Sequence, residues 1–493
     1  MHRASRPLRR RAAALTAAAA AATIALAGCS EPRPEPASDV GVQMFQWTWD
    51  AIATECTDVL GPSGYGWVLT SPPQEHILGP EWWTAYQPVS HLVESRLGTR
   101  EEFAAMVSTC GDAGVAVVAD AVVNHMTGQS DGGVGWAGSP FEHFEYPGLF
   151  SDAEGDFHHC GLTATDDIDD YLDAEQVQTC ELVNLADLDT STERVRERLA
   201  AYLEDLLSLG VAGFRIDAAK HMAVADVEGI VGGLPQDTRI LQEVIGGAGE
   251  PIQPADYLDV GDVFDFLFGR ELESIARTGS VDRAETLGAG PGSLPSDQAV
   301  VFVENHDTER NGSTLRYDDG WSYVLANVLM LAGTYGTPVV YSGYAFSERD
   351  TGPVQDQTGA VLDADCAAGS GPDAELDDGA WVCQHRWPAT TGMLGWRIAA
   401  GDSEVVDLWT DTKAIAFGRG EVAFVAVNGS PDARTDALTT SLPAGTYCDV
   451  IAGSLQDGEC TGVEVTVGSD GTAQVSVPAR SAVAVHVGAQ PGP

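Results

Sequence analysis

The chain has 493 residues, of which 44% are hydrophobic and 20% are charged, so it is long enough for two or three domains with large cores. Asp and Glu number 73 against 26 Lys and Arg, which gives a formal net charge of -47. This surplus of negative charge excludes nucleic acid and an anionic membrane surface as binding partners and favours a neutral ligand.

The N-terminus has the pattern of an export signal. Five arginines among the first eleven residues precede an Ala-rich apolar run over 12–27, which is short for a membrane span. The run ends in "LAGC", which resembles the bacterial lipoprotein box, so we expect Cys29 to be lipidated. A plain secreted protein is the alternative. We therefore assign 1–29 to a lipoprotein signal and 30–38 to a Pro-rich tether, and predict an exported protein that meets a membrane only through its lipid.

Nine cysteines become eight when Cys29 is set aside. An even number in an exported chain predicts four disulfide bonds, although the connectivity does not follow from the sequence. No Cys-x-x-Cys pair is present, so a zinc cluster is not expected. The eight are Cys56, Cys110, Cys160, Cys180, Cys366, Cys383, Cys448 and Cys460.

Between residues 39 and 396, apolar β-rich runs alternate with helical patterns that each end in a glycine. This alternation predicts an α/β fold, a (β/α)8 TIM barrel, with a doubly wound open sheet as the alternative. Buried strands are predicted within 66–73, 114–125, 211–221, 239–245 and 299–307, and helices within 99–114 and 191–210.

Two regions depart from this alternation. About a hundred residues separate Asp120 from Asp217, whereas one barrel repeat takes roughly 30. The excess, about 126–188, is predicted to be a small irregular domain inserted after strand 3. Beyond residue 396 the helical patterns stop and short alternating strands follow, so 397–490 is predicted to be a C-terminal all-β sandwich domain.

Polar residues gather where the predicted barrel strands end, which is where such barrels carry their reacting groups. Arg215 and Asp217 lie two residues apart and therefore on one face of their strand. The arginine is expected to keep Asp217 ionised, while the apolar run before Glu243 is expected to raise the pKa of that carboxyl. An ionised and a protonated carboxyl facing each other form the pair that cleaves glycosidic bonds.

Four short motifs stand at these strand ends in order, and a fifth lies in the tail. Together they resemble an α-amylase of glycoside hydrolase family 13, in the branch that holds animal and actinobacterial enzymes. The resemblance implies extracellular endo-hydrolysis of α-1,4-glucosidic bonds in starch- or glycogen-type polysaccharides by a retaining double displacement. The motifs are "DAVVNH" (120–125), "GFRIDAAKH" (213–221), "QEVI" (242–245), "FVENHD" (302–307) and "YCDVIAG" (447–453).

The resemblance also implies roles for individual residues. Asp217 matches the nucleophile, Glu243 the general acid/base, and Asp307 the third carboxylate, which stabilises the transition state. The positions that match substrate-binding residues are Trp82, Trp83, Tyr86, Gln87, His125, Arg215, Lys220, His221 and His306.

A structural Ca²⁺ is implied in the same way, held by Asn124, Asp187 and the carbonyl groups of Gln178 and His221. A bound chloride is not expected. The chloride site of animal relatives uses a second arginine, and the matching position here falls near Val339, where there is no arginine or lysine. The implied disulfide pairs are Cys56–Cys110, Cys160–Cys180, Cys366–Cys383 and Cys448–Cys460.

Other functions share parts of this pattern. A maltooligosaccharide-forming or glycosyl-transferring relative would use the same nucleophile and acid. A non-catalytic, starch-binding surface lipoprotein would have no need of three carboxylates and the arginine. The expected partner in every case is a starch-like α-glucan, and the protein is expected to be a monomer.

Overall fold

The computed structural model describes residues 36–367, 369 and 371–492. The predicted signal, Cys29 and most of the tether therefore lie outside the described residues. Within those ranges, every helix is too short or too polar to cross a lipid bilayer.

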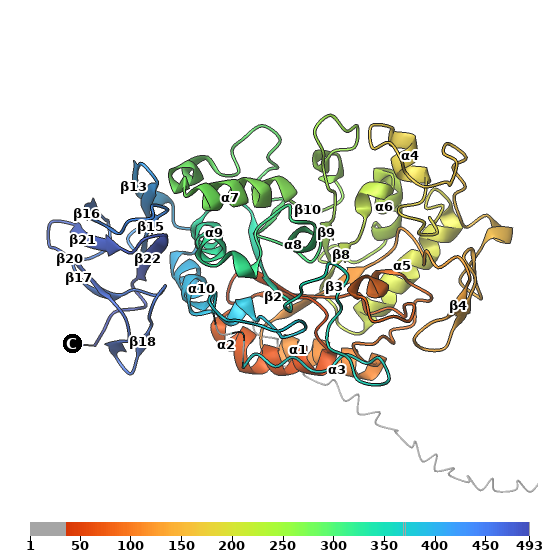
Figure 1. Cartoon of the computed structure of the whole chain (residues 1–493), viewed down its shortest axis with the longest axis horizontal. Coiled ribbons are helices and arrows are strands. Elements are labelled where there is room, and N and C mark those ends of the chain that lie inside the picture. Colours follow the sequence, from red (N-terminus) through yellow and green to blue (C-terminus); the bar gives the residue numbers. More distant parts are fainter. Residues whose placement is uncertain (1–35, 368, 370, 493) are drawn as a thin grey trace, which may run out of the picture. The chain divides into compact units, whose positions relative to one another are not determined.

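Eight parallel strands close into a barrel, as predicted, so the open-sheet alternative is wrong (Figure 1). Each strand pairs with the next one in the chain, and β1 pairs with β12 to complete the ring. The strands are β1 (Gly41–Met44), β2 (Trp67–Thr70), β3 (Ala116–Ala121), β8 (Gly213–Ile216), β9 (Arg239–Gln242), β10 (Asp262–Phe264), β11 (Ala299–Phe302) and β12 (Thr337–Ser342).

Helices connect the strands, and their sequences carry recognisable start and packing signals. Thr99 and Glu102 form a reciprocal capping box at the start of α3. The larger helices are α1 (Trp49–Glu55), α3 (Arg100–Asp112), α5 (Glu193–Ser208), α6 (Val224–Val231), α7 (Phe266–Thr278), α9 (Trp321–Ala332) and α10 (Pro388–Ala400). Shorter segments are η1 (Cys56–Leu60), α2 (Gly61–Ser63), η2 (Trp82–Tyr86), η4 (Ala219–His221), η5 (Pro254–Tyr257), η6 (Val281–Thr286), α8 (Thr308–Asn311), η7 (Tyr317–Asp319) and η8 (Gln384–Arg386).

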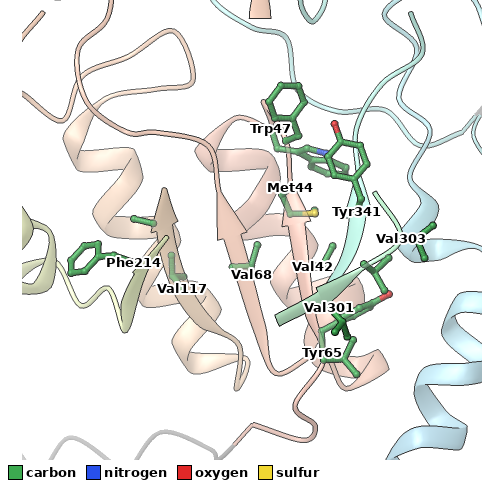
Figure 2. Close-up of a cluster of buried hydrophobic side chains, with 14 of the residues drawn as sticks. Val42, Met44, Trp47, Tyr65, Val68, Val117, Phe214, Val301, Val303 and Tyr341 are labelled. Carbon is green, nitrogen blue, oxygen red and sulfur yellow. The ribbon is translucent and has the colours of Figure 1, made fainter. Parts of the chain in front are cut away.

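Alternate residues of each strand face opposite sides of the barrel wall. Val42, Val68, Val117 and Phe214 lie in the large buried cluster drawn in Figure 2. A separate apolar cluster includes Trp67, Leu69 and Val118, which are neighbours of Val68 and Val117 on the same strands, and Leu241 of β9. The inward-facing positions continue toward the carboxyl ends of the strands, where polar side chains replace the apolar ones.

The part of the long interval between β3 and β8 that precedes α5 forms the predicted irregular insertion. This insertion contains two small two-stranded sheets and only short helices. Its elements are β4 (Gly133–Val134), β5 (Pro140–Phe141), β6 (Glu145–Tyr146), β7 (Phe150–Ser151), η3 (Asp152–Glu154) and α4 (Ala174–Thr179).

The C-terminal region is all β, as predicted, and forms two four-stranded antiparallel sheets with a shared apolar core and one further two-stranded sheet. Its first strands follow α10 directly, and the Trp396 indole donates to the carbonyl of Phe424 at 3.1 Å. The strands are β13 (Val405–Asp411), β14 (Ala414–Arg419), β15 (Ala423–Asn428), β16 (Arg434–Thr439), β17 (Gly445–Cys448), β18 (Leu455–Gln456), β19 (Glu459–Cys460), β20 (Glu464–Val467), β21 (Thr472–Val477) and β22 (Ser481–His486).

All four disulfide pairs implied by the resemblance are confirmed. The first ties η1 to α3, the second lies inside the insertion, and the last lies in the C-terminal domain. The pairs are Cys56–Cys110, Cys160–Cys180, Cys366–Cys383 and Cys448–Cys460.

Candidate active site

A cleft of about 600 Å³ opens at the carboxyl ends of the barrel strands. Arg215 lies beneath its floor and is 2% exposed. Every other residue predicted to be catalytic or substrate-binding lines this cleft. They are Trp82, Trp83, Tyr86, Gln87, His125, Asp217, Lys220, His221, Glu243, His306 and Asp307.

The Arg215 guanidinium binds three carboxylates at once. Its Nη1 donates to Asp217 Oδ1 at 2.8 Å and to Asp120 Oδ1 at 2.6 Å. Nη2 lies 2.7 Å from Glu243 Oε1, an ion pair whose atoms are not aligned as a hydrogen bond. The other oxygen of Glu243 accepts from the amide of Ala218 at 3.0 Å. One buried cation therefore fixes carboxylates from three neighbouring strands.

Burial and mutual repulsion set the ionisation of these groups. Burial raises the pKa of Asp217, while the charge of Arg215 and its hydrogen bond oppose that rise. Burial also raises the pKa of Glu243, and there the negative charge of Asp217 adds to the rise. Asp307 has its pKa raised to about 7 by burial and by Glu243. Arg215 opposes the rise at Glu243 as well, and because the two carboxyls share one guanidinium, ionisation of Asp217 disfavours ionisation of Glu243.

The ionisation of Asp217 differs from the expectation based on sequence. Arg215 was expected to keep Asp217 ionised, yet the pKa of Asp217 lies above its ordinary value. The reason is depth, because Asp217 is only 7% exposed and desolvation outweighs the arginine. The prediction of a raised pKa for Glu243 is confirmed in direction.

Aromatic rings form one wall of the cleft. The His306 ring lies between the rings of Phe45 and Tyr86, at centroid distances of 4.9 and 4.8 Å. The Tyr86 hydroxyl donates to Asp120 Oδ2 at 2.9 Å. Of the adjacent tryptophans predicted as a platform, Trp82 is buried, whereas Trp83 is half-buried and keeps a surface free for contact.

The opposite wall was only partly anticipated. Lys220 Nζ donates to the carbonyl of Ile245 at 2.7 Å and to Glu250 Oε2 at 2.5 Å, which holds the loop after β9 against η4. Two of the cleft residues that sequence reasoning missed, Ala218 and Ile245, lie within the quoted motifs, and the others lie in the insertion and in loops without periodicity or a motif. The missed residues are Tyr171, Leu182, Val183, Leu185, Ala218, Ile245, Gly246, Glu250, Arg349 and Asp350.

Two of the predicted calcium ligands, Asn124 and Asp187, are in contact where the insertion returns to the barrel. The Asn124 amide lies 3.2 Å from Asp187 Oδ1, and both side chains are buried. The His221 imidazole, at 3.0 Å from the carbonyl of Val177, places η4 beside the helix that carries Gln178. Throughout the described ranges, no three His, Cys, Asp or Glu side chains cluster as a metal site. Amide, carboxylate and carbonyl oxygens nevertheless suit the hard Ca²⁺ ion.

Comparison with known proteins identifies the family. A profile described as "Alpha amylase, C-terminal all-beta domain" matches residues 409–488. An α-amylase of Streptomyces violaceus is 44% identical over 98% of this chain and 80% of its own length. The chain belongs to the α-amylase family.

Solved structures of α-amylases agree with this assignment. Wild-type α-amylase I of Eisenia fetida superposes with a TM-score of 0.86 at 34% identity, covering 92% of this chain and 98% of that one. A variant of the same enzyme, in complex with maltohexaose, gives 0.83 at the same identity and coverage. Within the α-amylase family this chain is a glycoside hydrolase, and the cleft lined by Asp217, Glu243 and Asp307 is its candidate active site.

Proposed function

We propose that the protein hydrolyses internal α-1,4-glucosidic bonds of starch- or glycogen-type polysaccharides by a retaining double displacement at the Arg215-centred cleft. Asp217 attacks the anomeric carbon while Glu243 protonates the departing glycosidic oxygen. Glu243 then removes a proton from water, which releases the sugar from Asp217. The observation that carries this proposal is the contact of one buried guanidinium with both carboxylates, Asp217 at 2.8 Å and Glu243 at 2.7 Å.

The remaining cleft residues suit recognition of a sugar chain. Asp307, 35% exposed at its side chain, is placed to accept from sugar hydroxyls and to stabilise positive charge at the anomeric centre. Trp83 offers an apolar ring face for stacking, whereas Gln87 already accepts from Thr127 and the Gly128 amide and so holds the cleft edge. The proposed sugar-binding residues are Trp82, Trp83, Tyr86, Gln87, His125, Arg215, Lys220, His221 and His306.

We propose Asn124, Asp187 and the carbonyls of Gln178 and His221 as the holders of a structural Ca²⁺. The bound ion would supply charge neutralisation and cross-linking, since its ligands come from the end of β3, the insertion and η4. His158 already donates to Asp187 Oδ2 at 2.6 Å, so Oδ1 is the oxygen that this arrangement directs toward Asn124. We also propose that the protein is exported as a lipoprotein or as a secreted monomer, because a polysaccharide that is too large to import has to be cut outside the cell.

The test is digestion of soluble starch by the chain lacking residues 1–29, in the presence of calcium. Asp217→Asn removes the nucleophile, and Asp205→Asn is the matched control, since Asp205 binds Arg100 on the outer surface. Product sizes are followed over time.

Rapid loss of polymer length into mixed maltooligosaccharides by the parent and by Asp205→Asn, but not by Asp217→Asn, is the expected result. A single short product or lengthened glucans would indicate the maltooligosaccharide-forming or transferring alternative. Starch binding without turnover by any of the proteins would indicate a receptor and refute the mechanism.

A further inference from the structure

Gln43 is a buried side chain at the end of β1 that none of the proposed roles uses. It is 5% exposed, and its amide nitrogen lies 3.1 Å from Nδ1 of His306. Val42 and Met44, its neighbours on the strand, lie in the buried cluster of Figure 2, so Gln43 points to the other side of the wall. Gln43 is not among the residues that line the cleft, whereas its partner His306 is, so this contact links Gln43 to the cleft.

The His306 ring is held in one orientation. The Phe45 and Tyr86 rings stack on its two faces with interplanar angles of 16° and 13°. The Trp82 ring meets it edge-on at 5.6 Å. Exchanging the two ring nitrogens would require rotation of the imidazole out of this stack. Nδ1 therefore stays toward Gln43, and Nε2 stays toward the cleft.

The His306 imidazole is neutral, and so it carries one proton that can sit on either nitrogen. Burial lowers its pKa well below the ordinary value, and the charges of Arg215 and Arg310 lower it further. The other polar groups that face the ring are the Asp307 carboxylate, 3.6 Å from Nε2, and the stacked phenol of Tyr86. The hydrogen bond at one nitrogen then decides what the other presents to a ligand.

We propose that Gln43 is a positioning residue that selects the tautomer of His306 in which Nδ1 accepts from the Gln43 amide and Nε2 carries the proton. The opposite amide orientation would place a proton on Nδ1 and aim the lone pair of Nε2 at the Asp307 carboxylate, which is repulsive. With the proton on Nε2, the ring donates toward Asp307 and toward a sugar hydroxyl in the cleft. The inference rests on the proposed function, in which His306 binds the sugar.

The tautomer is measured directly by long-range ¹H–¹⁵N correlation spectra of protein labelled with ¹⁵N-histidine, with His306 assigned from its missing signals in His306→Asn. Gln43→Glu places an acceptor of the same shape opposite Nδ1 and should move the proton there. Gln43→Leu removes the donor. Gln74→Leu is the matched control, since that buried glutamine accepts from Tyr202 and does not contact His306.

We expect the parent to show a proton on Nε2, Gln43→Glu to show it on Nδ1, and kcat/KM on maltooligosaccharides to fall about tenfold to a hundredfold in that variant. Gln43→Leu should give mixed tautomers and a smaller loss, and Gln74→Leu should leave the His306 signals unchanged. A parent with its proton on Nδ1, variants that keep the parent tautomer, or a tautomer change without loss of kcat/KM would overturn the inference. Failure of the proposed function would appear instead as turnover by Asp217→Asn, whatever the spectra show.

Discussion

Replacing Arg215 by methionine should destabilise the protein in a way that grows with pH. Three buried carboxylates surround this guanidinium at 2.6–2.8 Å. Removing one partner of a buried ion pair costs about 3–5 kcal/mol, because the other charge is left without compensation. Here the carboxylates can instead take up protons, so the cost depends on how far the pH lies above their ordinary pKa values.

The direction of the pH dependence follows from linkage. Burial already raises the pKa of Asp120 to about 7 in the presence of the arginine, and loss of the cation raises it further. A folded-state pKa above the unfolded value gives stability that is present at low pH and is lost as pH rises. In Arg215→Met the folded-state pKa values are higher still, so more of the free energy of unfolding is lost as pH rises. The destabilisation relative to the parent should be about 1 kcal/mol near pH 5 and about 3–5 kcal/mol near pH 8.

Urea denaturation of the parent, Arg215→Met and Arg215→Lys at pH 5 and pH 8 measures this difference. Lysine keeps one charge but cannot contact three carboxylates in the same geometry, so it should fall between the other two. The acid limb of the kcat/KM–pH profile should also shift to higher pH in Arg215→Met, because Asp217, the proposed nucleophile, must still lose its proton. An equal destabilisation at both pH values, together with an unmoved acid limb, would refute this account of the network.

Two further predictions concern groups away from the reacting centre. Burial raises the pKa of Glu309 to about 7, so in the parent this group gives up about 2–3 kcal/mol of stability as pH rises from 5 to 8. Glu309→Gln keeps the acceptor for Tyr341 and should flatten the dependence of the free energy of unfolding on pH, measured by urea denaturation. An unchanged dependence would show that folding does not alter the pKa of this carboxyl. EDTA should lower the melting temperature and speed hydrogen exchange around 181–187, by an amount equivalent to about 3–4 kcal/mol at millimolar Ca²⁺. Ca²⁺ but not Mg²⁺ should restore both, and an indifference to EDTA would remove the proposed site.

Five of the eight barrel strands could be predicted because their signals are local and repeated, whereas β1, β10 and β12 were not predicted individually. Each buried strand is an apolar run, and the helices α3 and α5 begin at threonine caps that can be recognised in the sequence. The pairing of cysteines came from the family resemblance, because spacing alone leaves many pairings open for eight cysteines. Tyr171, Glu250 and Asp350 could not be placed, since their loops have no period that fixes where the backbone turns.

The electrostatic arrangement of the site could not be predicted from the sequence, and the reason is physical. Reading the sequence pairs Arg215 with Asp217 because they share a strand face, but Asp120 and Glu243 join the same guanidinium from neighbouring strands only when the barrel closes. Closure also removes water from all four groups, and that desolvation raises the pKa values that a lone arginine would have lowered. Burial raises the pKa of both Asp217 and Glu243 against the charge of Arg215, and at Glu243 the charge of Asp217 adds to the rise. The proposed roles of nucleophile and acid therefore depend on the assembled network, and this is why perturbing Arg215 tests the proposed mechanism more severely than perturbing either carboxylate.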